Sequence, residues 1–354
     1  MQINKDLSAA ISVARGLALF SIVSAHIVFL KGTPAVFSNF YANFGTIGVV
    51  AYYIISGFLF VPEHYGGFLK MLKNKAKAIG LPWVILGSTV YFYKVYFTRV
   101  YSLKAHIKWL LGKNTYLYFI TVLLLCFVIC YLVKNKAALW GFVALNILSL
   151  ELTAFGVLQP AIAFLHITNN LNVFNWLGFF ALGRLARGLN GEGIYSFLKK
   201  ARIWLLLLFV GATALLLALG LKSTYISHLG WLYELLGAAA IFGAATFAGL
   251  KNPVLQKISN DSFAVYLTHF LIIELMNRVC HRVFAFAPPL QLFANLFVIG
   301  VTVAAIELLL LLARGLKISP FVCAVFGVRG PKAKLPKGGQ ATALASQSNP
   351  GTRR

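Results

Sequence analysis

Ten long apolar runs dominate this sequence. Each is close to the roughly 20 residues that an α-helix needs to cross the hydrocarbon core of a bilayer. Charged residues make up only 11% of the 354-residue chain and hydrophobic residues 60%, whereas a soluble domain typically carries about 25% charged residues. These proportions exclude a soluble enzyme and predict an all-α integral membrane protein, a bundle of about ten transmembrane helices. The runs cover residues 9–30, 43–62, 79–98, 115–133, 138–158, 171–187, 203–221, 229–250, 261–284 and 290–313.

The stretch 159–187 is the least regular part of this pattern. Pro160 and the polar run Thr168-Asn169-Asn170 interrupt its hydrophobicity. Irregular backbone is tolerated at membrane depth only where it is buried in protein or lines a cavity. We therefore expect a broken or re-entrant element here.

The distribution of basic residues predicts the orientation. The chain has 32 Lys and Arg against 8 Asp and Glu, a net charge of +24. Loops on the cytoplasmic side of a membrane protein carry an excess of Lys and Arg. With the N-terminus in the cytoplasm, 23 of the 32 basic residues fall inside and nine outside. This asymmetry predicts that both termini are cytoplasmic.

One loop runs against this asymmetry. Residues 94–113 carry five basic side chains on the predicted outer side. The segment either lies on the membrane surface or contacts an anionic ligand, unless one of the spans is misassigned. An amphipathic stretch lying on the surface is the interpretation we favour. The five are Lys94, Arg99, Lys104, Lys108 and Lys113.

The chain divides into a transmembrane domain, residues 1–314, and a tail, residues 315–354. The tail is basic, has no acidic residue and is rich in Gly, Pro, Ser and Ala. We expect it to be disordered in the cytoplasm and attracted to anionic membrane lipid. Basic residues are dispersed over loop ends, so nucleic acid is not an expected partner. The four cysteines have no metal-ligand spacing, and no metal site is predicted.

The first apolar run contains two ionisable residues, Arg15 and His26. Eleven residues on a helix make about 1,100°, close to three full turns, so both side chains should share one face about 16 Å apart. Arg15 then lies near the cytoplasmic surface and His26 past the midplane. Arginine suits bidentate contact with phosphate, and histidine can act as a base near neutral pH. The alternative is an arginine that extends to the interface and a histidine that only packs.

A second polar pattern occupies the run 261–284. Ser262, Tyr266, His269 and Ile273 follow helical spacing and form one stripe. Polar groups facing lipid are unfavourable, so this stripe should face the bundle interior or a water-filled cavity. His269 would then either take part in a functional site or make a structural hydrogen bond.

The pair of small residues Ser56-Gly57 is a third candidate functional feature. Small residues let two helix backbones approach closely. Helix packing explains this pair, and lining the path of a ligand is the alternative.

Three segments resemble membrane-bound acyltransferase family 3. Residues 11–26 are similar to its opening, with an Arg-x10-His motif in the first helix. Residues 45–59, with Ser56-Gly57-Phe58, are similar to its G-V-x-x-F-F-x-x-S-G-F segment, and residues 258–269 to its S-Y-x-x-Y-L-x-H helix. Weaker similarities are Tyr118-Phe119 and residues 179–183.

The sequence departs from the family at three positions. Ser12 stands where the family usually has Asp, and Tyr116 where a histidine is often found. An R-x3-R pair after the second helix appears as Lys73 and Lys77, which keep the charge but lose the planar fork of arginine.

The resemblance implies a multi-pass enzyme of the bacterial inner membrane. Such an enzyme transfers an acyl group, most often acetyl, from cytoplasmic acyl-CoA to a hydroxyl of a glycan or glycolipid. By this resemblance Arg15, Lys73 and Lys77 would bind the CoA phosphates, and Ser56 and Gly57 the acyl path. His26 would be the base or an acyl relay. The residues expected to hold or orient the acceptor are Ser262, Tyr266 and His269.

Two other classes remain open. A secondary transporter that exports a lipid-linked or anionic substrate could also have ten helices with scattered intramembrane charge. Such a transporter would more readily show an internal repeat with paired broken helices, and the two halves of this chain show no convincing similarity. A noncatalytic scaffold would leave the Arg15–His26 register without a purpose.

Overall fold

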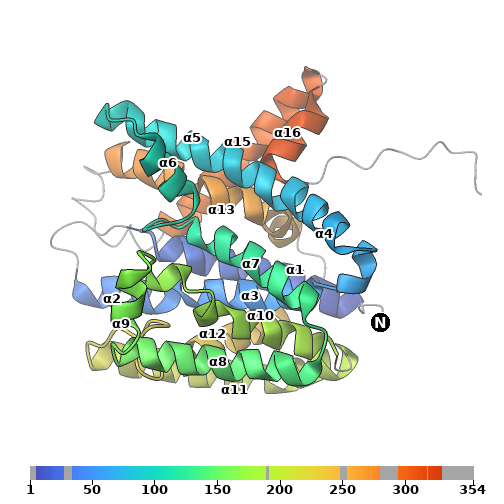
Figure 1. Cartoon of the computed structure of the whole chain (residues 1–354), viewed down its shortest axis with the longest axis vertical. Coiled ribbons are helices and arrows are strands. Elements are labelled where there is room, and N and C mark those ends of the chain that lie inside the picture. The colour runs from blue at the N-terminus through green and yellow to red at the C-terminus, as the bar shows by residue number, and fades with distance from the viewer. Residues whose placement is uncertain are drawn as a thin grey trace, which may run out of the picture.

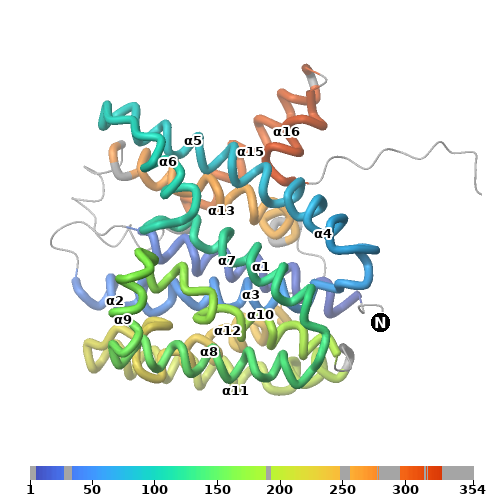
Figure 2. Tube along the Cα trace, viewed as in Figure 1, coloured from blue at the N-terminus to red at the C-terminus, as the bar shows by residue number. Residues whose placement is uncertain are grey.

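The computed structural model describes residues 5–27, 34–188, 191–247, 253–279, 294–316 and 318–328. Across these residues the chain is helical and contains no strand (Figures 1 and 2). The helices are α1 (Lys5–Ser24), α2 (Ala35–Gly45), α3 (Ile47–Leu59), η1 (Pro62–Tyr65), α4 (Phe68–Lys75), η2 (Ala76–Gly80), α5 (Leu81–Thr98), α6 (Leu103–Leu110), α7 (Tyr118–Leu132), α8 (Lys136–Ala154), α9 (Gln159–Phe164), η3 (Asn169–Leu171), α10 (Phe174–Arg187), α11 (Gly191–Ala218), α12 (Gly230–Ala245), α13 (Pro253–Val279), α15 (Ala294–Gly315) and α16 (Ser319–Phe326).

The long helices form a bundle with two distinct ends. In Figure 1 the N-terminus and α4 lie at one end, and α2, α6 and α9 lie at the other. Each of the ten predicted runs contains a helix. Within the described part of the chain, six helices are long and apolar enough to cross a membrane, counting α2–α3 and α4–α5 as continuous helices. An all-α membrane protein is therefore confirmed, while ten spans and cytoplasmic termini stay predictions.

The irregular element expected in residues 159–187 is present. The short helix α9 ends near His166, which has a left-handed backbone (φ 52°), and the 3₁₀ turn η3 leads into α10. Side-chain amides satisfy the interrupted backbone: Asn175 Nδ2 donates to the Asn169 carbonyl at 3.0 Å, and Asn175 Oδ1 accepts from Ser149 Oγ at 2.7 Å. These bonds join the broken segment to α8.

Glycines bring the central helices into backbone contact. A methyl group on Gly57 would lie 1.9 Å from the carbonyl oxygen of Phe180, and one on Gly183 would lie 2.0 Å from that of Ile54. Helices α3 and α10 therefore touch through two glycines, one from each helix. Close approach of this kind is the usual role of small residues between membrane helices, and the packing interpretation of Gly57 is confirmed.

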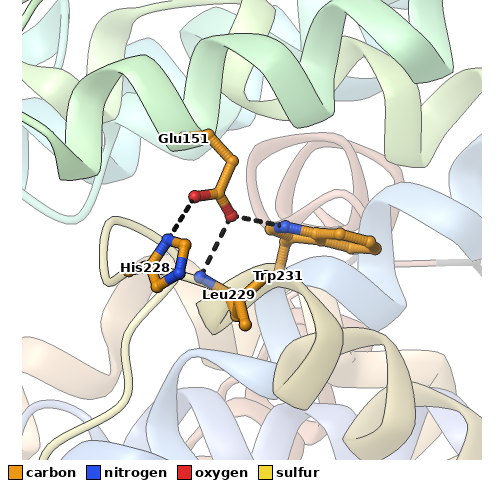
Figure 3. Close-up of polar contacts among 4 residues, drawn as sticks. All are labelled: Glu151, His228, Leu229 and Trp231. Carbon is orange, nitrogen blue, oxygen red and sulfur yellow. Dashed lines mark hydrogen bonds and ion pairs between the residues drawn. The ribbon is translucent and has the colours of Figure 1, made fainter.

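The carboxylate of Glu151 connects α8 to the start of α12 (Figure 3). Glu151 of α8 accepts three hydrogen bonds, from the His228 Nδ1 at 2.7 Å, the Leu229 backbone N–H at 3.0 Å and the Trp231 Nε1 at 2.7 Å. Leu229 has a left-handed backbone (φ 56°) at the start of α12. Glu151 therefore holds the beginning of α12 against the end of α8.

The glycine contact predicts a difference between two alanine substitutions. Gly183→Ala should lower stability by about 1–3 kcal/mol, because overpacking forces backbone shifts. Gly141→Ala, in α8, should leave stability unchanged or raised, since nothing lies within 4 Å of an added methyl there. Thermal unfolding of purified protein in detergent measures both. Equal melting temperatures for the two variants would contradict the packing argument.

Candidate functional site

Arg15 lies halfway along α1 and points toward α13. Its Nη2 donates to Ser262 Oγ at 3.2 Å, and the Tyr52 hydroxyl of α3 donates to the Arg15 carbonyl at 3.0 Å. Because α1 begins at Lys5, Arg15 is about 15 Å along the helix.

Arg15 lines a cavity, called here the Arg15 cavity, with about 970 Å³ of empty space including the part open to the outside. Three predicted residues, Ser56, Ser262 and Tyr266, share its wall. Gly57 does not, because it packs against α10. The other lining residues are Ile22, Tyr52, Ile55, Leu59, Lys75, Ala78, Ile79, Phe119, Leu123, Phe127, Phe263 and Gly327.

The lysine at the Arg15 cavity differs from the two that the sequence indicated. Lys73 and Lys77 are exposed and outside the lining. Lys75 is half-buried, lines the cavity, and has its Nζ 3.6 Å from the centroid of the Phe127 ring. The spacing taken from the family motif missed Lys75, because Lys75 is on a different side of the helix from Lys73 and Lys77.

His26 lies just beyond the end of α1. The helix ends at Ser24, and the His26 N–H donates to the Val23 carbonyl at 3.1 Å in a tight turn. The prediction that Arg15 and His26 share one helix face assumed a continuous helix, but the helix ends two residues before His26. His26 still faces α13, with its ring centroid 5.2 Å from that of His269.

His269 is fully buried and has one free ring nitrogen. Its Nδ1 lies 2.6 Å from the Tyr266 carbonyl oxygen, which can only accept, so Nδ1 carries the proton. In the neutral ring Nε2 is then an acceptor, and among the described residues it has no hydrogen-bond partner. Ser262, Tyr266 and Ile273 are buried as well, so the stripe faces the bundle interior, as expected.

Aromatic rings surround the histidine pair. The Tyr116 hydroxyl donates to the Leu267 carbonyl at 2.8 Å, and the Tyr266 hydroxyl donates to the Tyr116 carbonyl. The ring centroids of Tyr116 and Phe270 lie 6.1 and 5.4 Å from that of His26. Sequence reasoning did not assign Tyr116 to the site, although its position is where the family often has a histidine.

Tyr116 and Phe270 also line a second cavity, called here the Lys94 cavity, of about 850 Å³ including its open part. It lies by α6 and the end of α5, at the opposite end of the bundle from α4 (Figure 1). Aromatic residues that contact the histidine pair therefore line both cavities: Tyr116 and Phe270 line the Lys94 cavity, and Tyr266 lines the Arg15 cavity. The remaining lining residues are Val90, Tyr93, Lys94, Phe97, Thr98, Trp109, Asn114, Thr115, Glu274 and Arg278.

Comparison with known proteins identifies the family. Residues 8–310 match an acyltransferase domain, that of acyltransferase family 3, and the chain belongs to this family. With its apolar helices, this makes it a multi-pass membrane protein of an acyltransferase family.

Curated relatives come from Staphylococcus aureus. In strains MRSA252, MSSA476 and MW2 a protein named "Probable poly-beta-1,6-N-acetyl-D-glucosamine export protein" is 24% identical over 262 residues, 69% of this chain and 74% of the relative. No solved structure matches the chain significantly.

The two cavities predict opposite patterns of thiol labelling. Ser56→Cys should react with a membrane-impermeant maleimide only from the side of the N-terminus, and Thr98→Cys only from the other side, because these residues line cavities at opposite ends. Right-side-out and inverted vesicles distinguish the sides. Ser149→Cys, which is buried, should not react beyond the parent protein. Labelling of both cavity variants from one side would contradict this arrangement.

Proposed function

We propose that this protein transfers an acyl group from acyl-CoA, bound in the Arg15 cavity, to a hydroxyl of a glycan or glycolipid in the Lys94 cavity. The observation that carries the proposal is the position of the His26–His269 pair between two cavities at opposite ends of the bundle. A transferase across a membrane needs such an arrangement, because donor and acceptor arrive from different sides.

The Arg15 cavity supplies what a CoA thioester requires. CoA carries several phosphate charges, and the arginine fork binds phosphate bidentately. Ser262 orients the Arg15 guanidinium, and Lys75 adds a second cation in the same wall. The narrow pantetheine arm would extend along Ser56 and Tyr266 toward the histidines.

The chemical step is attack of an acceptor hydroxyl oxygen on the thioester carbonyl carbon. His26 takes the hydroxyl proton as the new ester C–O bond forms. The carbon–sulfur bond then breaks, and the CoA thiolate leaves and takes up a proton. His269 is a positioning residue, whose unpartnered Nε2 can accept a hydrogen bond from the His26 ring.

Direct transfer is favoured over an acyl-enzyme relay because residues in the walls of both cavities contact the same histidine pair. A relay would form an acyl-His26 intermediate in the absence of acceptor. Incubation with acyl-CoA alone, followed by intact-mass measurement, separates the two routes. A stoichiometric mass increase lost in His26→Ala would establish the relay.

Export is the second candidate, supported by the name of the staphylococcal relatives. An exporter moves its substrate without covalent change, whereas the proposed enzyme leaves an ester on the acceptor. Reconstituted vesicles given radiolabelled acetyl-CoA on one side and a glycolipid extract distinguish them. Base-labile label in the glycolipid supports transfer, and glycan flux without label supports export.

His26→Ala should abolish acyl transfer, because removing a general base costs roughly 10²–10⁴-fold in rate. Transfer of label from acetyl-CoA to glycolipid measures it, with size-exclusion elution as the check on folding. His228→Ala is the matched control, since His228 lies in the Glu151 cluster and should retain activity. Full activity of the His26 variant would refute the proposed role.

Arg15→Ala and Lys75→Ala should each raise the KM for acyl-CoA by roughly tenfold while changing kcat less, since a charge-assisted contact with phosphate is lost. Lys73→Ala should have little effect, because Lys73 is exposed outside the cavity. Steady-state kinetics at varied acyl-CoA test this ranking. A larger effect at Lys73 than at Lys75 would return the donor site to the position that the family motif indicated.

A further inference from the structure

The basic residues between 94 and 113 are not explained by the donor site. A third cavity, called here the Lys108 cavity, adjoins the Lys94 cavity and has about 880 Å³ of empty space including its open part. The two cavities share walls at Lys94, Thr98, Trp109, Asn114 and Thr115. The two adjoining cavities, between α5, α6, the segment after α6 and α13, are together called here the outer recess.

The outer recess is strongly cationic. Lys94, Lys108, Lys113 and Arg278 line it, and Glu274 is the single acid among its described lining residues. Glu274 is already paired with Arg278 at 2.8 Å. Three lysines therefore remain without a lining carboxylate. Gathering like charges in a recess is unfavourable unless a negative group binds there.

Two of the lysines that line the recess, Lys94 and Lys108, are exposed, and Lys113 is half-buried. Lys94 Nζ lies 5.3 Å from the centroid of the Trp109 ring, and Lys113 Nζ donates to the His166 carbonyl at 2.7 Å. Arg99 and Lys104, from the same basic segment, do not line the recess. Three of the five basic residues of this segment therefore line the outer recess.

Part of the wall of the outer recess lies next to the histidine pair. Tyr116 and Phe270 line the recess and contact His26 with their rings. Trp109, Tyr93 and Phe97 add aromatic faces to the wall, and such faces pack well against the apolar faces of sugar rings. A ligand with both a sugar and a negative group would fit this combination.

We propose that the outer recess binds an acidic glycan acceptor, with Lys94 and Lys108 contacting a carboxylate or phosphate and the aromatic wall contacting the sugar. This inference rests on the proposed function, because it specifies the acceptor for that reaction. It also explains why the segment 94–113 is basic although it lies on the predicted outer side, where basic residues are otherwise few. The anion would hold one end of the acceptor while a hydroxyl reaches His26.

Binding is testable without catalysis. Purified full-length protein in phosphatidylcholine nanodiscs is titrated with a glucuronic-acid oligosaccharide, with N-acetylglucosamine 1-phosphate, and with a neutral N-acetylglucosamine oligosaccharide. Tryptophan fluorescence reports occupancy, and Trp109→Phe identifies the signal from the recess. The acidic probes should bind saturably, more weakly at high salt, and far more tightly than the neutral one. The better acidic probe separates carboxylate from phosphate.

The lysine variants give the decisive comparison. The double variant Lys94→Gln/Lys108→Gln should weaken acidic-probe binding by about tenfold or more. Lys104→Gln should not, because Lys104 is an exposed lysine of the same helix α6 that does not line the recess. Equal binding of the neutral probe, or an equal effect of Lys104→Gln, overturns the proposal. So does a fluorescence change caused by phosphatidylglycerol nanodiscs but by neither acidic probe, because the lysines would then contact the membrane surface.

The test of acidic-probe binding and the test of the proposed acyl transfer can fail independently. His26→Ala should bind the acidic probes like the parent protein, because His26 does not line the recess. If His26→Ala keeps transferring label, the proposed mechanism fails while the recess stands as an anion site. If transfer depends on His26 but acidic probes do not bind, only the assignment of the acceptor fails.

Discussion

The packing of α1 against α13 is the interaction on which the site depends. Inside a bilayer, backbone polar groups must be satisfied within each helix, so chemistry has to come from side chains between helices. Arg15 meets Ser262 and His26 meets His269 across this one interface. Helix α3 supports it from behind, where Gly48 approaches the Ala18 carbonyl so closely that a methyl group would lie 2.1 Å from it.

Local periodicity made much of the fold predictable. Apolar runs correspond to helices, the polar break at Asn169 and Asn170 corresponds to an interrupted element, and the Ser262 stripe faces inward. Each of these features is encoded within about 20 neighbouring residues. The last turn of α1 was not predictable in this way, because Ala25 packs against Gly45 of another helix and the chain turns there. His26 therefore occupies a turn that the sequence of α1 alone does not reveal.

Partners from distant segments were the least predictable part of the site. Glu151 meets His228 and Glu274 meets Arg278, whereas Glu234 bonds with Thr46 and Glu307 with Lys257. No local pattern chooses among these partners. The histidine pair instead has aromatic neighbours, and the lysine in the donor wall is Lys75 rather than its neighbours two residues away. Which side of a short helix faces a cavity depends on packing by α7 and α13, which no local pattern contains.

The hydrogen bonds that Tyr116 and Tyr266 make have a consequence for the membrane around the protein. Two recesses that open at opposite ends of a membrane protein would form a water-filled pore if they joined. The Tyr116 hydroxyl donates to the Leu267 carbonyl, and the Tyr116 backbone carbonyl accepts from the Tyr266 hydroxyl. Moving the Tyr116 ring aside therefore breaks the first bond, and moving the Tyr266 ring aside breaks the second. In a membrane that carries an ion gradient, side chains held in this way between two open recesses would also oppose the leakage of ions through the protein.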